Sequence, residues 1–211
     1  MARPARTATH PTLAARRQPA QQRSRDRMGR IQDVARHLIA QKGSDQLKMS
    51  EIAAQAGISI GSLYQYFPDK RSIIRTLAQG YAAESRACIE QALATVRSKA
   101  ELQSAFSSLV DQYHQLFLTA PVKRDIWCGM RTDKELMSIE LEESRACGEF
   151  LADAIRRVNP KADAKKVAAL AFLVWELGEE TMRLAVSHKR SEGALLVQAY
   201  KTMALRAIAE A

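Results

Sequence analysis

The stretch Lys48–Lys70, KMSEIAAQAGISIGSLYQYFPDK, predicts two short helices joined by a tight turn. Gly57 and Ile58 form the turn, because a glycine after a short apolar-periodic segment is typical of a helix end. The apolar residues on either side recur at the spacing of one helical face. They are Ile52, Ala53 and Ala56 in the first helix, and Leu63 and Phe67 in the second.

The outward side of the second helix is polar. Hydroxyls, an amide, phenol rings and a bare backbone suit hydrogen bonding to phosphates and base edges. They supply no paired general acid, base or nucleophile. The pattern therefore predicts a helix-turn-helix that binds DNA and not a reaction centre. The outward set is Ser59, Gly61, Ser62, Tyr64, Gln65 and Tyr66.

The positive charge of the chain lies in its N-terminal third. The 211 residues carry a net charge of +9, and residues 1–75 hold 14 Lys and Arg against 5 Asp and Glu, while residues 76–211 hold 18 against 18. A basic segment that contains the helix-turn-helix favours a polyanionic partner. A solvated basic tail with no partner is the simpler alternative. We expect residues 1–23 to form a disordered basic arm and residues 24–70 to form the DNA-binding domain.

The remainder, residues 71–211, shows only helical periods. Asp69 is placed to cap a fourth helix, Pro121 ends a later one, and Asn159-Pro160 ends another. The expected fold is all-α with about nine helices: an N-terminal three-helix domain and a larger helical domain that binds an effector and forms a dimer. The expected later helices cover a segment ending at Pro121, then 123–131, 134–158, 163–188 and 192–209.

The last two of these helices are apolar around much of their circumference. The run AALAFLVWELG lies in the first of them. Such helices need apolar neighbours on more than one side, so we expect a homodimer through this pair. Burial within one subunit is the alternative. The apolar positions of the last helix include Leu195, Leu196, Tyr200, Met203, Leu205 and Ile208.

Several classes of protein are disfavoured. The histidines are scattered, the three cysteines are widely spaced and no Gly-rich nucleotide loop occurs, so we expect no enzyme, no metal and no cofactor. An odd set of separated cysteines favours a reducing, cytoplasmic location. The longest apolar run, Val167–Trp175, is interrupted by Glu176, so we expect no membrane span.

The run EIAAQAGISIGSLYQYFPDK, residues 51–70, resembles the tetracycline-repressor (TetR) family of transcriptional regulators. The likeness lies in its Ile-Ala, Gly-Ile-Ser, Gly-Ser-Leu-Tyr, Tyr-Phe and Asp-Lys positions and covers roughly residues 24–80. The resemblance implies an operator-binding N-terminal domain and a second domain with a small-molecule pocket. It also implies that effector binding shifts the fourth helix.

By this resemblance, Ser50 and Lys70 join the outward residues of the second helix as DNA contacts. Lys70 is suited to neutralise a phosphate. Gln65 is the candidate for a base contact, because its amide can pair bidentately with adenine. Lys48 stands where a Thr or Ser is common, and it can replace a hydroxyl contact with an ionic one. Ser44 stands where an aromatic residue is common.

The effector pocket implied by the resemblance has candidates that combine apolar bulk with polar groups. Each could instead be ordinary core. Glu176, a carboxylate within an apolar run, needs a partner: Arg131, Arg183, solvent or a cationic ligand, with an arginine or solvent preferred. The candidates are Tyr113, His114, Phe117, Trp127, Cys128, Met130, Trp175 and Glu176.

These expectations describe a sequence-specific regulator that binds double-stranded DNA. We expect a dimeric repressor that leaves a palindromic operator when a small molecule occupies its second domain. The alternative is an architectural protein that binds DNA without sequence preference or effector. Such a protein would not need a charge-neutral helical second domain.

Overall fold

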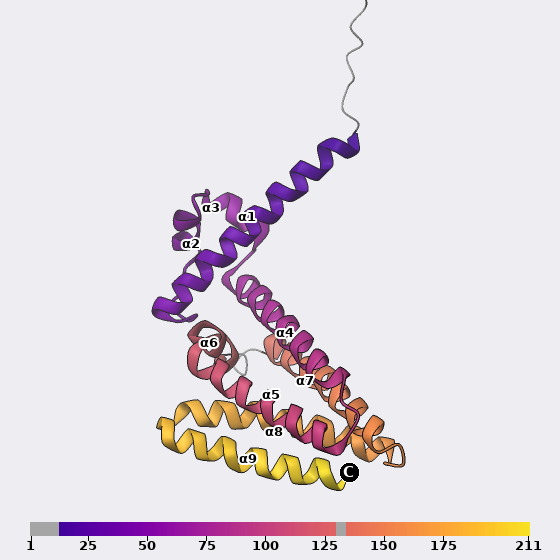
Figure 1. Cartoon of the computed structure of the whole chain (residues 1–211). Helices are drawn as coiled ribbons and strands as arrows, with labels where there is room; N and C mark the ends of the chain where they lie inside the picture. The colour runs from indigo at the N-terminus through magenta and orange to yellow at the C-terminus, as the bar shows by residue number, and fades with distance from the viewer. Residues whose placement is uncertain (1–12, 130–133) are drawn as a thin grey trace, which may run out of the picture. The chain divides into compact units, whose positions relative to one another are not determined.

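The computed structural model describes residues 13–129 and 134–211, and this part of the chain forms nine helices and no strand (Figure 1). The expected all-α fold is therefore confirmed. The chain divides into two compact units. The first comprises the described chain up to Lys42 and Gln46–Ile73, and the second comprises Gly43–Asp45 and Ile74–Ala211.

The first unit contains α1 (Leu13–Lys42), α2 (Met49–Ala56) and α3 (Ile60–Tyr66). Gly57 ends α2 in the left-handed conformation, with φ 66°, and its N–H group bonds to the carbonyls of Ala53 and Ala54. This is a backbone geometry that glycine adopts without steric cost. The predicted helix-turn-helix core is present: the buried side chains include Ile31, Leu38, Ile39, Ile52, Ala53, Ala56, Leu63 and Phe67.

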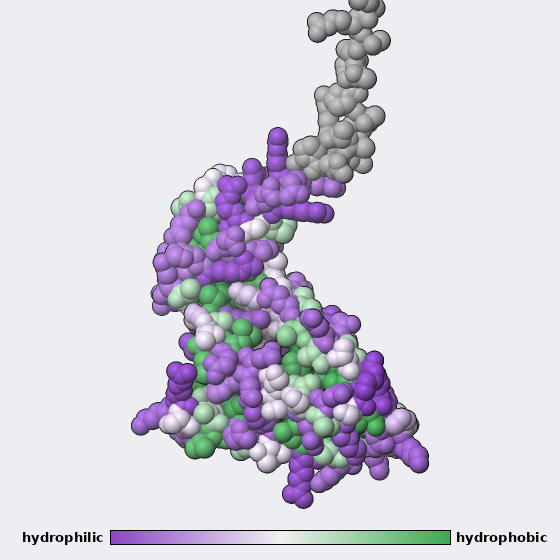
Figure 2. Space-filling view, in the orientation of Figure 1, coloured by the Kyte–Doolittle hydropathy of each residue, from purple (hydrophilic) through white to green (hydrophobic). Residues whose placement is uncertain are grey.

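α1 is longer than the sequence predicts. It begins at Leu13, whereas the expected arm extends to residue 23 and the expected helix starts at Ser24. Residues 21–30 are almost all exposed, so this part is helical without a buried face, and Figure 2 shows hydrophilic residues over most of its visible surface. The Ala, Arg and Gln residues of segment 13–23 have high intrinsic helix propensity, which periodicity alone does not register. Residues 1–12 of the expected arm lie outside the described residues.

α4 (Lys70–Ala94) begins in the first unit and continues in the second. Asp69 caps it as predicted: its carboxylate accepts a hydrogen bond of 2.7 Å from the Ser72 N–H group. The Ser72 side chain reaches back to the Asp69 backbone. Such a reciprocal arrangement satisfies N–H groups that the first helical turn leaves open.

The second unit is completed by α5 (Lys99–Thr119), α6 (Pro121–Gly129), α7 (Lys134–Val158), α8 (Ala164–Ser187) and α9 (Arg190–Glu210). α8 packs against α7, α9 and α5, so it is the central helix of this unit (Figure 1). Side chains on three sides of α8 therefore contact side chains of neighbouring helices. The proline expected to end one helix also starts the next, because its missing N–H group costs nothing in a first turn.

Two close approaches bring α9 against α8. Gly193 faces the Ala185 carbonyl, and a Cβ atom at Gly178 would lie 2.8 Å from the hydroxyl oxygen of Tyr200. That hydroxyl donates a hydrogen bond of 2.7 Å to the Val174 carbonyl. The two glycines thus permit a helix separation that larger residues would prevent.

The opposite sides of α8 and α9 carry exposed leucines and a methionine. Leu195 is 72% exposed and Met203 67%, which are high values for residues of this size. On α8, Leu173, Leu177 and Leu184 recur at helical spacing and are about half exposed. Packing within one subunit therefore does not bury all the apolar side chains of α8 and α9, and both helices keep an exposed apolar stripe. No helix among the described residues is long and apolar enough to span a bilayer.

Candidate functional site

The exposed face of the helix-turn-helix is polar and lies in the first unit. Tyr64 is 51% exposed, although a ring of this size normally packs. Every residue of the predicted DNA-contacting set lies on the start of α2, on α3 and its cap, or at the start of α4. Lys48, Ser50, Ser59, Gly61 and Gln65 are exposed as well, and Ser62, Tyr66 and Lys70 are half-buried.

Local hydrogen bonds define how this face is presented. The Ser59 hydroxyl oxygen caps α3 by accepting a hydrogen bond of 3.1 Å from the Ser62 N–H group, which leaves the hydroxyl hydrogen as a donor. Lys48 occupies the N-cap position of α2 but makes no capping bond with its side chain. Lys48 is exposed at the start of that helix. The Lys42 ammonium, in contrast, is paired with Glu51.

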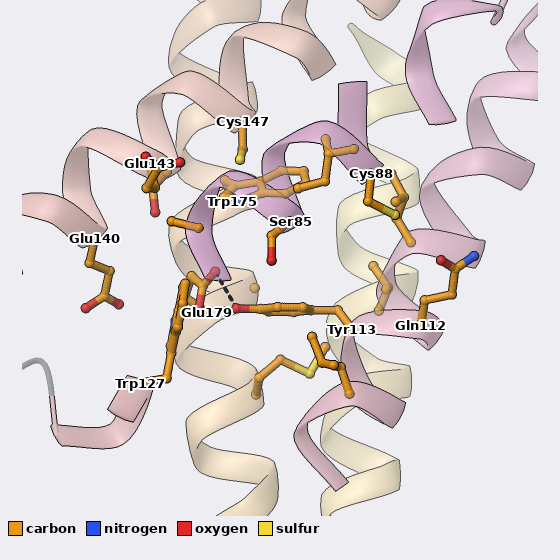
Figure 3. A pocket seen from close by; sticks show the side chains of 18 of the residues that line it. Ser85, Cys88, Gln112, Tyr113, Trp127, Glu140, Glu143, Cys147, Trp175 and Glu179 are labelled. Atoms are coloured by element: carbon orange, nitrogen blue, oxygen red, sulfur yellow. Dashed lines mark hydrogen bonds between the residues drawn. The ribbon is translucent and has the colours of Figure 1, made fainter. Parts of the chain in front are cut away.

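The second unit contains a partly open cavity of about 320 Å³ between α4, α5, α6, α7, α8 and α9. This volume is at the lower end of the range for small-molecule sites, roughly 300–1,000 Å³. Much of the wall is apolar, including Ala82, Ile89, Phe106, Leu109, Val110, Leu116 and Met182. The polar lining comes mainly from glutamates and from the rings that surround them (Figure 3).

Glu179, on α8, is the central polar group of the cavity. It is only 6% exposed, and its carboxylate accepts hydrogen bonds of 2.8 Å from the Tyr113 hydroxyl and 2.6 Å from the Trp127 indole N–H group (Figure 3). Burial raises the pKa of this carboxyl from 4.5 to about 7, although both hydrogen bonds favour the ionised form. Burial beside this carboxylate also raises the pKa of the Tyr113 hydroxyl well above its ordinary value.

The other glutamates of the cavity pair with basic side chains. Arg183 binds Glu140, and both side chains are almost fully buried. Arg86 binds Glu143 with two N–H groups, one of them at 3.0 Å. Such charge-assisted, bidentate contacts are stronger than neutral ones and hold their helices together. The remaining pair is Lys123 and Glu84, 3.9 Å apart.

Only some of the effector candidates predicted from the sequence line the cavity. Tyr113, Trp127 and Trp175 line the cavity. Phe117 is buried behind Tyr113, with ring centroids 5.0 Å apart, and His114 lies outside the lining. Met130 and Arg131 lie outside the described residues. Cys128 is exposed and is not part of the wall.

Glu176 does not line the cavity either, and one of its carboxylate oxygens is buried without a hydrogen bond. Arg183, one of the partners considered for it, binds Glu140 and Glu180 instead. The sequence reasoning missed Glu179, three residues further along α8. A usable signal existed, because Trp175, Glu179 and Met182 recur at the i, i+4, i+7 spacing of one helical face.

The three cysteines of the chain lie on separate helices and differ in burial. Cys147 is buried, and burial raises the pKa of its thiol to about 12, whereas Cys88 and Cys128 are exposed. Within residues 13–129 and 134–211, no group of three or more His, Cys, Asp or Glu side chains could hold a metal ion.

Fold and sites together define a helix-turn-helix DNA-binding protein with a separate ligand-binding helical unit. Family comparison gives the same class. Residues 31–77 match the model described as "Bacterial regulatory proteins, tetR family", and residues 100–210 match "Tetracyclin repressor-like, C-terminal domain". The chain therefore belongs to the TetR family of transcriptional regulators.

Two characterised relatives are similar over part of the chain. The Fatty acid metabolism regulator protein of Bacillus subtilis (strain 168) is 27% identical over 121 residues, which cover 57% of this chain and 58% of that protein. The HTH-type transcriptional regulator BetI of Cronobacter sakazakii is 29% identical over 151 residues, 67% of this chain and 72% of that protein. The first match thus spans little more than half of the relative.

Solved structures share the fold at lower identity. A TetR-family transcriptional regulator from Streptomyces coelicolor has a TM-score of 0.66 at 19% identity, with 89% of this chain and 98% of that chain covered. FadR from Bacillus subtilis in complex with stearoyl-CoA has a TM-score of 0.57 at 18% identity, with 85% and 96% covered. These similarities concern the fold alone.

Proposed function

We propose that this regulator is a cytoplasmic repressor that binds a palindromic operator as a homodimer and is released by a small molecule. The main support is that one chain combines an exposed polar face on α3 with a largely apolar cavity in its other unit. An architectural protein would use the first feature and have no use for the second. A repressor needs only to occupy its promoter, whereas an activator also needs a surface for polymerase.

The operator contacts proposed are those on α2, α3 and the start of α4. Gln65 reads a base edge, and Tyr64 and Tyr66 donate phenolic hydrogen bonds. The small residues allow close approach to phosphates, and the lysines neutralise them. The full set is Lys48, Ser50, Ser59, Gly61, Ser62, Tyr64, Gln65, Tyr66 and Lys70.

The homodimer proposed forms through α8 and α9. The exposed stripe on these helices, which includes Leu173, Leu177, Leu184, Leu195 and Met203, has the character of a homodimer interface. Two such pairs related by a two-fold axis would form a four-helix interface. A dimer also lets two α3 helices reach half-sites about 34 Å apart.

The effector proposed binds in the cavity around Glu179. α4 supports a link to DNA binding, because one continuous helix has Lys70 at its start and Ser85, Cys88 and Ile89 in the cavity wall. A ligand that favours one position of α4 shifts the population of DNA-binding conformations. Of the predicted candidates, Tyr113, Trp127 and Trp175 are kept as ligand contacts.

A competition binding assay tests the proposal. The full chain is titrated against labelled DNA from upstream of its own gene, with matched random duplex as competitor at a stated salt concentration. A repressor should prefer its operator by about 10³-fold or more. Equal affinity for both duplexes would instead support the architectural alternative, and it would contradict a sequence-specific repressor.

A further inference from the structure

The Glu179 carboxylate has only neutral hydrogen-bond partners in the part of the chain that the structure describes. Its donors are the Tyr113 hydroxyl and the Trp127 indole. The other glutamates of the cavity each have a basic side chain beside them. Glu140 has Arg183, Glu143 has Arg86, and Glu84 has Lys123.

A second acceptor in the same wall is also incompletely used. Glu140 is 7% exposed, and while one of its oxygens binds Arg183, the other is buried without a hydrogen bond. Buried carboxylate oxygens are costly when they lack a partner. Among the described residues, the cavity wall thus contains one carboxylate without an ion pair and one with an oxygen that lacks a hydrogen bond, and both features favour a positively charged guest.

Aromatic rings lie around the first of these carboxylates. Figure 3 shows Tyr113 and Trp127 reaching Glu179 from α5 and α6. Trp175 lies one turn before Glu179 on α8 and also lines the cavity. Ring faces attract cations, most strongly where water is excluded, and they attract quaternary ammonium groups that cannot donate a hydrogen bond.

The same wall disfavours anions. Among the described residues, its charged lining comprises Glu84, Glu140, Glu143 and Glu179 against one lysine, Lys123, which lies near Glu84. Arg86 and Arg183 are already bound to carboxylates. The carboxylate of a fatty acid or the phosphates of an acyl-CoA would have to break these ion pairs or lie close to the negatively charged glutamates in a site of low polarity.

We infer that the effector is an organic monocation with an apolar body, whose positive charge lies against Glu179 and between the rings of Tyr113, Trp127 and Trp175. This inference names the ligand class for the proposed effector site and rests on that function for its regulatory meaning. The apolar part of the guest occupies the side of the cavity formed by Phe106, Leu109 and Val110. Charge and ring contacts, and not size alone, select the ligand.

Intrinsic fluorescence offers a direct test, because the two tryptophans of the chain both line the cavity. The DNA-free full chain is titrated at pH 8 with benzyltrimethylammonium and with neopentylbenzene, its uncharged isostere. We expect the cation to bind at least about tenfold more tightly. Tetraethylammonium and methyltriphenylphosphonium extend the test to other sizes, and stearoyl-CoA supplies the anionic comparison.

Glu179→Gln keeps the side-chain size and removes the negative charge. It should lower cation affinity at least about tenfold and leave the affinity for neopentylbenzene unchanged, which also shows that the cavity is folded. Glu90→Gln, an exposed change on α4, should match the unaltered protein. Equal binding of the cation and its isostere, or tighter binding of stearoyl-CoA, would overturn the inference. So would full cation affinity in Glu179→Gln, or a result in which none of the three cations binds at millimolar concentration.

DNA affinity is measured separately from ligand binding, so the two proposals fail in different ways. Cation binding that leaves operator affinity unchanged supports the ligand class and contradicts effector-driven release. Operator release by an uncharged or anionic compound bound in this cavity supports release and contradicts the ligand class. Cation binding that lowers operator affinity supports both.

Discussion

The indole N–H group of Trp127 donates a 2.6 Å hydrogen bond to the carboxylate of Glu179, 52 residues away in the chain. The bond is buried and joins α6 to α8 in the cavity wall. A hydrogen bond to a charged acceptor is stronger than one between neutral groups. α6 is a short helix, and this bond is one of the contacts that position it. The protonation state of Glu179 therefore affects the cavity wall as well as any guest.

The pKa of Glu179 predicts a stability change with pH. Its carboxyl titrates at about 7 in the folded chain and near 4.5 when unfolded, so between these values the folded state holds a proton that the unfolded state has lost. The free energy of unfolding should fall as pH rises through this window, by roughly 2 to 3 kcal/mol for this group between pH 5 and 8. Urea unfolding at both pH values should show this fall reduced in Glu179→Gln and retained in Glu90→Gln.

The same titration should appear in ligand affinity. Below pH 7 a permanent cation must displace the Glu179 proton, so its affinity should fall up to about tenfold per pH unit and stay constant above pH 7. A flat profile from pH 5 to 8 would contradict this.

The charged and titratable groups around Glu179 are Glu84, Arg86 and Cys88 on α4, Tyr113 on α5, Lys123 on α6, Glu140, Glu143 and Cys147 on α7, Arg183 on α8 and Tyr200 on α9.

Tyr113→Phe removes one hydrogen bond to the Glu179 carboxylate and keeps the ring against Phe117. Because that bond favours the ionised carboxylate, its loss should raise the pKa of Glu179 further. Cation affinity at pH 7 should fall by roughly tenfold or more and recover at higher pH. Tyr81→Phe, which removes a phenol outside the cavity lining, is the matched control. A loss of affinity that is the same at every pH would point to altered packing instead.

Gly178→Ala should destabilise the chain by about 1–3 kcal/mol, because the new methyl group would lie 2.8 Å from the Tyr200 hydroxyl oxygen. The penalty should be smaller in a Tyr200→Phe background, which a double-mutant cycle of urea unfolding measures. Gly80→Ala on α4 meets nothing within 4 Å, and it should stabilise its helix by about 0.5–1 kcal/mol. Equal effects at both glycines would contradict the packing described.

Two α3 substitutions should affect DNA binding differently. Tyr64→Ala should weaken operator and non-operator DNA together, since phosphate contacts carry no sequence information. Gln65→Ala should reduce discrimination at one base pair by about 1–3 kcal/mol. Binding to a panel of single-base operator variants separates the two results. Gln91→Ala, exposed on α4, should leave both affinities unchanged.

Leu195→Glu places a charge in the exposed stripe of α9 and should raise the dissociation constant of the homodimer at least about tenfold, as measured by analytical ultracentrifugation. Operator affinity should fall with it, because both half-sites must be held together. Leu141→Glu introduces the same charge at an exposed leucine of α7. Dimer loss in Leu141→Glu alone would move the interface away from α8 and α9.

The helix-turn-helix could be predicted closely because its determinants are local. A glycine turn, the Ser59 and Asp69 caps and apolar residues three or four positions apart act within a few residues of chain. The later helices were also predictable from Pro121, Asn159-Pro160 and their apolar periods. The start of α1 at Leu13 was not, since residues 21–30 are almost all exposed and carry no apolar period that would mark the helix.

The sequence alone determined the all-α fold, the position of the DNA-binding motif and the segregation of positive charge. Only the tertiary structure decided that Glu179 faces the cavity while Glu176 lies outside its lining. These glutamates are less than one helical turn apart, so the choice depends on where α5, α6 and α7 pack around α8. The tertiary structure also decided which charges pair: Arg183 binds Glu140, and Arg86 binds Glu143. These partners lie far apart in the chain, so their pairing depends on helix packing and leaves no local pattern in the sequence.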